Sequence, residues 1–113
     1  MEIDNNEIEK QKQDIIIRIS RARNNANLSA RALSQKIDMN DGYINRLESK
    51  KDFLPSIDVL LKIINVCGLT CEEFFYENTS DYSKDKEIIR LLSFVDEKTK
   101  DAVITLLKNI RNF

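Results

Sequence analysis

The stretch from Leu28 to Pro55 constrains the fold of this chain more than any other part of its sequence. Ser29 is a favoured helix N-cap residue, because its hydroxyl can accept a hydrogen bond from the free amides of the first helical turn. Small or apolar side chains then recur at the three- and four-residue spacing of one buried helix face, at Ala30, Leu33, Ser34 and Ile37. The pattern predicts a short helix that ends at the turn Asp38-Met39-Asn40.

A second short helix is predicted after this turn. Asn40 is a favoured N-cap residue for it, and we expect Met39 to point inward. Ile44 and Leu47 lie about one helical turn apart and predict the buried side, which leaves an exposed polar side with Asp41, Gly42, Asn45 and Arg46. Two helices joined by a tight turn, the second with a polar exposed face, are typical of a DNA-reading helix-turn-helix.

The charge of the chain is informative only when it is resolved along the sequence. Over the full 113 residues, 18 Lys and Arg stand against 19 Asp and Glu. Residues 15–54, however, carry eight basic and four acidic side chains, whereas residues 55–82 carry one and five. The positive segment contains the predicted helix-turn-helix, where DNA phosphates would be met. An ordinary mixed surface would also give an excess of this size.

The chain resembles the Cro/CI-type (XRE family) helix-turn-helix transcriptional regulators, without a gap, at Leu28-Ser29, Leu33, Ile37, Tyr43-Ile44-Asn45, Leu47-Glu48 and Pro55. The resemblance covers about residues 15–76, and the run from Tyr43 to Glu48 is its most specific part. It implies a five-helix, lambda-repressor-like domain that binds double-stranded DNA. It also implies that Arg23, on the first helix, pairs with Glu48 at the end of the DNA-reading helix.

Position by position, the resemblance implies that Asp41, Gly42 and Arg46 face the bases. Arg46 is suited to guanine, because a guanidinium can bond the O6 and N7 atoms together. Asn45 could contact a phosphate or an adenine, or remain an ordinary surface residue. Phosphate contacts are expected at the start of the first helix of the motif, at the start of the second and in the loop beyond it. The predicted DNA-binding residues are Ser29, Ala30, Arg31, Asn40, Asp41, Gly42, Tyr43, Asn45, Arg46, Lys50 and Lys51.

This chain departs from the family pattern at several positions. Ala30 replaces the usual Gln, and Ser34 and Asp38 stand where a small Ala and a Gly are usual. Asp41 places a carboxylate at the DNA-facing end of the second helix, where it suits the helix dipole. The same carboxylate repels phosphate unless it accepts a hydrogen bond from the amino group of a cytosine.

The remaining sequence predicts an all-α fold, a five-helix domain followed by a C-terminal two-helix hairpin. The first helix is expected from Gln11 to Asn25. After a Ser56 cap, a fourth helix is expected to bury Ile57, Leu60, Leu61 and Ile64 and to end at Gly68. A Thr70/Glu73 capping box opens a fifth helix, which ends in the core residues Phe74 and Phe75. The predicted domains are a flexible lead-in at 1–10, the helix-turn-helix domain at 11–76, a linker at 77–83 and the hairpin at 84–113.

The hairpin is predicted from helices at 84–95 and 97–112, the second capped by Asp96. Apolar side chains of the first of these helices cover about 220° of its circumference, whereas one partner face needs about 100–140°. The hairpin must therefore pack on the first domain or on a second copy of the chain. We expect a homodimer through Ile88, Leu91, Leu92, Val95, Val103, Leu106, Leu107 and Ile110.

Several classes of function receive no support from the sequence. No apolar run long enough to span a membrane and no secretory leader is visible, so we expect a cytoplasmic protein. The chain has no His, so Cys67 and Cys71 are expected to be buried reduced thiols, with no metal site and no cofactor. The absence of His and of a Gly-rich phosphate loop argues against an enzyme.

Two functions remain. The first is a dimeric, sequence-specific DNA-binding regulator, most simply a repressor. The second is a protein-interaction module that keeps the fold and pairs with a related regulator as its antagonist.

Overall fold

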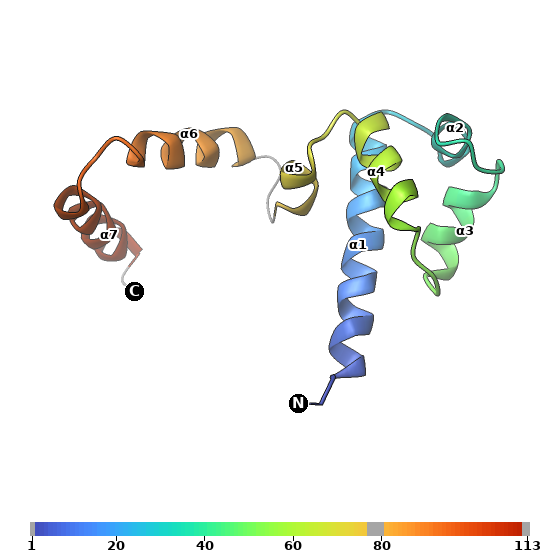
Figure 1. Ribbon diagram of the computed structural model, residues 1–113, viewed down its shortest axis with the longest axis horizontal. Coiled ribbons are helices and arrows are strands. Elements are labelled where there is room, and N and C mark those ends of the chain that lie inside the picture. Colours follow the sequence, from blue (N-terminus) through green and yellow to red (C-terminus); the bar gives the residue numbers. More distant parts are fainter. Residues whose placement is uncertain (1, 77–80, 112–113) are drawn as a thin grey trace. The chain divides into compact units, whose positions relative to one another are not determined.

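The computed structural model (Figure 1) describes residues 2–76 and 81–111. These residues contain seven α-helices and no strand, which confirms the predicted all-α class. The chain divides into two compact units, Met1–Glu77 and Asn78–Phe113. Most of the predicted linker, residues 77–80, and the last two residues, 112–113, lie outside the described residues. The helices are α1 (Asn5–Asn25), α2 (Ala30–Lys36), α3 (Tyr43–Lys50), α4 (Ile57–Val66), α5 (Cys71–Phe75), α6 (Tyr82–Leu92) and α7 (Glu97–Arg111).

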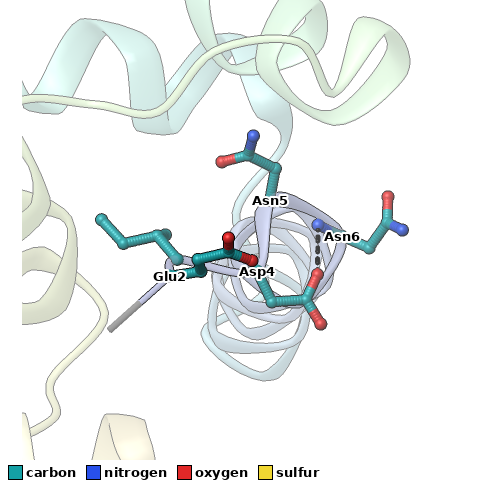
Figure 2. Close-up of a pocket in the computed structure, with 5 residues that line it drawn as sticks. Glu2, Asp4, Asn5 and Asn6 are labelled. Carbon is teal, nitrogen blue, oxygen red and sulfur yellow. Dashed lines mark hydrogen bonds between the residues drawn. The ribbon is translucent and has the colours of Figure 1, made fainter.

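Helix α1 begins at Asn5 rather than at Gln11, so the predicted lead-in at residues 1–10 is wrong for most of its length. The reason is an N-cap at Asp4. One carboxylate oxygen of Asp4 accepts hydrogen bonds from the backbone N–H groups of Asn6, at 2.9 Å (Figure 2), and of Glu7, at 3.3 Å. A local cap of this kind starts a helix even where few apolar residues follow.

The core of the first unit lies between α1 and the four shorter helices. Its buried apolar side chains are Ile16, Ile19, Ala22, Leu33, Ile37, Tyr43, Ile44, Leu47, Leu60, Ile63, Ile64 and Phe74. Helix α1 contacts α3, α4 and α5, while α2 packs on α3 and α4. This arrangement buries the predicted inner sides of both helices of the motif.

Three predicted core positions are wrong. Ile57 is 72% exposed, and Leu61 and Phe75 are also exposed. On α4 the buried stripe runs through Leu60, Ile63 and Ile64, so Ile63 takes the inward place that was assigned to Leu61. Helix α5 is a single short turn and can turn only one of its two adjacent phenylalanine rings inward.

Arg18 closes the domain at the end of α5. Its Nη1 atom donates to the carbonyl oxygens of Phe74, at 3.1 Å, and Tyr76, at 2.7 Å, while its Nε atom donates to Asp14 at 2.8 Å. Carbonyl groups at a helix C-terminus have no partner within the helix. A side chain of α1 therefore satisfies them, and α5 is tied to the longest helix of the domain.

The second unit consists of α6 and α7. Asp96 caps α7 by accepting a hydrogen bond from the N–H group of Thr99 at 2.8 Å, as predicted, and hydrogen bonding to Thr99 lowers the pKa of Asp96. None of the described side chains in this unit is fully buried. Leu92 and Val103 are half-buried, and the other predicted interface residues remain exposed: Ile88, Leu91, Val95, Leu106, Leu107 and Ile110.

The predicted hairpin therefore does not bury its own apolar side chains.

Across the described residues, no helix is long and apolar enough to cross a membrane.

Candidate nucleic-acid interface

Helices α2 and α3 form the two halves of the predicted motif, and a buried serine joins them. Ser34 is fully buried, and its hydroxyl donates to the carbonyl oxygen of Ala30 at 2.8 Å. The hydroxyl oxygen of Ser34 also accepts a hydrogen bond from the N–H group of Ile44 at 3.0 Å. Ser34 therefore satisfies a free amide in the first turn of α3, although it lies in the preceding helix. Ser29 caps α2 as predicted, through the N–H group of Ala32 at 3.0 Å.

The prediction that Asn40 is the N-cap of α3 is wrong. Gly42 occupies the cap position, and no side chain of its own can fill the capping role. Asn40 instead accepts a hydrogen bond from Arg46 Nη2 at 3.4 Å. The Asn40 side chain thus contacts the guanidinium that was predicted to read a base, while Ser34 supplies the side-chain bond to the first turn of α3.

The angle at which α3 projects is fixed by a salt bridge to α1. Arg23 Nε and Nη2 each lie 2.9 Å from an oxygen of Glu48, and Ser20 donates to Glu48 at 2.6 Å. Arg23 Nη1 also donates to the carbonyl oxygen of Leu28 at 2.9 Å. The two charged side chains are only 17% and 16% exposed. Hydrogen bonding to Glu48 raises the pKa of Arg23. This is the ion pair that the family resemblance implies, with Ser20 as an additional partner.

The loop after α3 is held by α1 as well. Lys51 has a left-handed backbone, with φ of 56°, and its N–H group donates to the carbonyl oxygen of Leu47 at 3.2 Å. Its own carbonyl oxygen accepts from Gln13 Nε2 at 2.9 Å. Lys50 and Lys51 are both exposed, which leaves their ammonium groups available to phosphate.

The end of the motif that was predicted to face DNA carries a second ion pair. Arg31 Nη2 lies 3.2 Å from one carboxylate oxygen of Asp41, and Gln35 Nε2 donates to the other at 3.1 Å. Arg31 and Gln35 lie four residues apart on α2, so they share a face of that helix. The sequence predictions treated Arg31 and Asp41 separately and did not include Gln35. The four-residue spacing of Arg31 and Gln35 could have indicated that these two side chains lie on the same face of α2.

The predicted DNA-binding residues differ in accessibility. The exposed ones are Ser29, Arg31, Asn40, Asp41, Gly42, Asn45, Arg46, Lys50 and Lys51. Ala30 is half-buried, and Tyr43 is the least accessible, at 7% exposure. The Tyr43 ring packs edge-on against Phe53 at 5.8 Å between centroids, and burial raises its pKa. Tyr43 thus has a packing role that the prediction of a phosphate contact did not include.

Two other features lie outside this interface. Residues 2–6, drawn as sticks in Figure 2, line a pocket, and the carboxylates of Glu2 and Asp4 disfavour a phosphate there. Cys67 is half-buried at the end of α4, where burial raises its pKa, but Cys71 is exposed at the start of α5. The prediction of two buried thiols is therefore wrong for Cys71.

Two short helices with a tight turn, a rigidly held second helix and exposed polar side chains at its start define a DNA-binding helix-turn-helix protein. A family model described as "Helix-turn-helix" matches residues 19–74. Residues 19–74 therefore form a helix-turn-helix domain of the Cro/CI-type (XRE) family, as the sequence predicted. Comparisons with curated proteins and with solved structures find no match.

Proposed function

We propose that this protein is a sequence-specific transcriptional repressor that binds double-stranded DNA as a homodimer in the cytoplasm. The observation that carries the DNA-reading part is the placement of Arg46. This exposed guanidinium lies on a helix that the Arg23–Glu48 salt bridge holds in place. A fixed, exposed arginine in this position suits bidentate contact with guanine. Repression is the simplest regulatory role, because it requires only that the operator be occupied.

The dimer is proposed from the apolar surface of the second unit. Ile88 and Ile110, for example, are 55% and 65% exposed in the single chain. Exposed apolar surface of this kind is stabilised when a partner removes it from water. Two copies of the motif would then demand a two-fold symmetric operator, with half-sites about one helical turn of DNA apart.

The test is a selection of bound duplexes from random DNA, followed by titration of the selected and scrambled duplexes at two salt concentrations. Arg46→Ala should cost about 1–3 kcal/mol on the selected duplex and little on the scrambled one. Lys50→Ala should weaken both duplexes about equally and reduce the salt dependence by about one unit of slope. Lys98→Ala, which removes an exposed cation of α7, is the matched control and should change neither.

A second function is favoured by the carboxylate of Asp41 at the DNA-facing end, together with the exposed apolar side chains of α6 and α7. The protein would then be an antagonist that pairs with a related regulator. Under this alternative, the parent protein would bind no selected duplex better than a scrambled one. It would instead form a stable complex with the related regulator and release that regulator from its operator.

A further inference from the structure

Asp41 is oriented from both sides by the same helix. Arg31 Nη2 approaches one carboxylate oxygen at 3.2 Å, and Gln35 Nε2 approaches the other at 3.1 Å. Asp41 itself lies in the turn immediately before the Gly42 cap of α3. We name these three residues, Arg31, Gln35 and Asp41, the Asp41 cluster. It joins the predicted phosphate-contacting helix to the predicted base-facing end of the motif.

The ion pair in the Asp41 cluster is weak enough for DNA to open. Its side chains are 71% and 57% exposed for Arg31 and Asp41, and exposed pairs of this type contribute little to stability. A DNA phosphate near α2 would compete for Arg31, because guanidinium binds phosphate bidentately. If Arg31 turned to phosphate, one oxygen of Asp41 would lose its partner next to the polyanionic backbone.

Only one of the four bases can fully replace the hydrogen bond that Asp41 would lose from Arg31. An ionised carboxylate accepts hydrogen bonds but cannot donate them. In the major groove guanine presents two acceptors, thymine an acceptor and a methyl group, and adenine an acceptor beside its amino donor. Cytosine presents an amino donor alone. A cytosine opposite Asp41 would therefore replace the bond to Arg31, whereas guanine or thymine would leave the carboxylate facing an acceptor.

We infer that Asp41 is a specificity-determining residue that restricts binding to sites with a cytosine opposite it, and that Arg31 is the positioning residue that couples this restriction to phosphate binding. The inference rests on the proposed function as a DNA-binding regulator. On DNA without that cytosine, Arg31 stays with Asp41 or leaves it unpaired, and either outcome weakens binding. On DNA with it, Arg31 contacts phosphate while Asp41 accepts from the cytosine amino group.

The experiment compares the full-length parent with Asp41→Asn, Arg31→Gln and the double variant. Each is taken through selection from random duplexes and then titrated against the selected duplex, its single-base substitutions and a scrambled duplex. Both substituted positions are exposed, and thermal melting verifies that each variant folds. Asp38→Asn is the matched control, because it removes a carboxylate from the same turn at another exposed position.

The parent should select cytosine at one position of each half-site and lose about five- to a hundredfold in affinity when that base alone is changed. Asp41→Asn should abolish this preference and tighten binding to scrambled DNA by about three- to tenfold. In the Arg31→Gln background the tightening should be smaller, since the two side chains act as a coupled pair. Asp38→Asn should keep the cytosine preference of the parent.

Several results would overturn the inference. If Asp41→Asn keeps the base preferences of the parent, Asp41 reads no base. If the tightening is equal with and without Arg31, Asp41 merely repels DNA and the coupling to Arg31 is absent. Both results leave a sequence-specific protein and so spare the proposed function. A parent that selects no sequence at all would instead overturn the proposed function, and this inference with it.

Discussion

Left-handed backbone marks the ends of the first four helices. The residues with positive φ in the described chain are Asn27, Asp38, Lys51 and Gly68, which follow α1, α2, α3 and α4 respectively. Gly68, with φ of 78°, has the left-handed backbone that was predicted at the end of α4, one residue beyond the C-cap Cys67. Glycine adopts this conformation without steric cost, and Asn and Asp tolerate it better than other residues do. Asp38 and Lys51, which are not glycine, therefore carry some backbone strain before and after α3.

Asp38→Gly should stabilise the fold, because φ of 60° at this position places the Asp side chain against its own backbone. The expected gain in the free energy of unfolding is about 0.5–1 kcal/mol, after allowance for the greater freedom of glycine in the unfolded chain. Urea denaturation measures it. Asp38→Ala should have the opposite sign, since alanine is strained at positive φ. A loss of stability in the glycine variant would contradict the strain argument.

Lys51→Gly should increase the stability of the fold but weaken its binding to DNA. Removal of the side chain relieves the left-handed strain and raises the free energy of unfolding by up to about 1 kcal/mol. It also removes a proposed phosphate contact, so binding to every duplex should weaken and the salt dependence should fall by about one unit of slope. Lys50→Ala is the comparison, because Lys50 is helical and should weaken DNA binding without a gain in stability. If Lys51→Gly binds DNA with the affinity of the parent, Lys51 does not contact DNA phosphate.

At the scale of elements, the orientation of α3 depends on a few side chains of α1. Glu48 accepts hydrogen bonds from Arg23 and from Ser20, and Gln13 holds the loop that follows. These contacts join residues far apart in sequence, and they act at the end of α3 opposite to the Ser34 link. Helix α3 is therefore held at both ends, which is what a helix that must present fixed side chains to a groove requires.

Glu48→Ala should lower the melting temperature sharply. The change leaves the partly buried guanidinium of Arg23 without its carboxylate, and removal of one partner from such a pair costs about 3–5 kcal/mol. Circular dichroism melting measures the effect. Glu87→Ala is the control, since it breaks the solvent-exposed pair with Arg90 on α6 and should leave the melting curve of the parent unchanged. Equal melting curves for both variants would show that the Arg23–Glu48 pair does not hold the domain together.

At the scale of the whole molecule, the two units are stabilised differently. The first has a closed apolar core, whereas the described part of the second leaves its apolar side chains exposed or half-buried. Residues outside the predicted dimerisation set add to this exposed surface, among them Ile89, Phe94 and Ile104. The second unit should therefore depend on a partner for its stability, and a second copy of the chain supplies one of matching chemistry.

Leu107→Glu in the full chain should convert the proposed dimer into a monomer, because a carboxylate buried in an apolar interface without a partner is strongly unfavourable. Light scattering at several protein concentrations measures the mass. Thr105→Glu introduces the same charge about 160° around α7 from Leu107 and should leave the dimer intact. A parent protein that is monomeric at all concentrations would contradict the dimer. Monomeric Leu107→Glu should also bind a two-fold symmetric operator less tightly than the parent.

The sequence by itself determined the features that depend on near neighbours along the chain. Ser29, Ser56 and Asp96 each cap a helix through the N–H group three residues later, and Thr70 and Glu73 form the predicted capping box. The apolar spacing of α2 and α3 likewise placed Leu33, Ile37, Ile44 and Leu47 in the core. These features could be predicted because a cap or a helical stripe involves residues only three or four positions apart.

Apart from the Arg23–Glu48 pair, which the family resemblance implied, only the tertiary structure decided the contacts between helices. Ser34 caps α3 in place of Asn40, Arg18 satisfies the end of α5, and Arg31 pairs with Asp41. Each joins residues that the sequence separates by ten positions or more, so their proximity depends on how the helices pack. Packing also selected Ile63 over Leu61 for the inner face of α4, because a stripe of apolar residues wider than the available contact leaves its outermost members exposed.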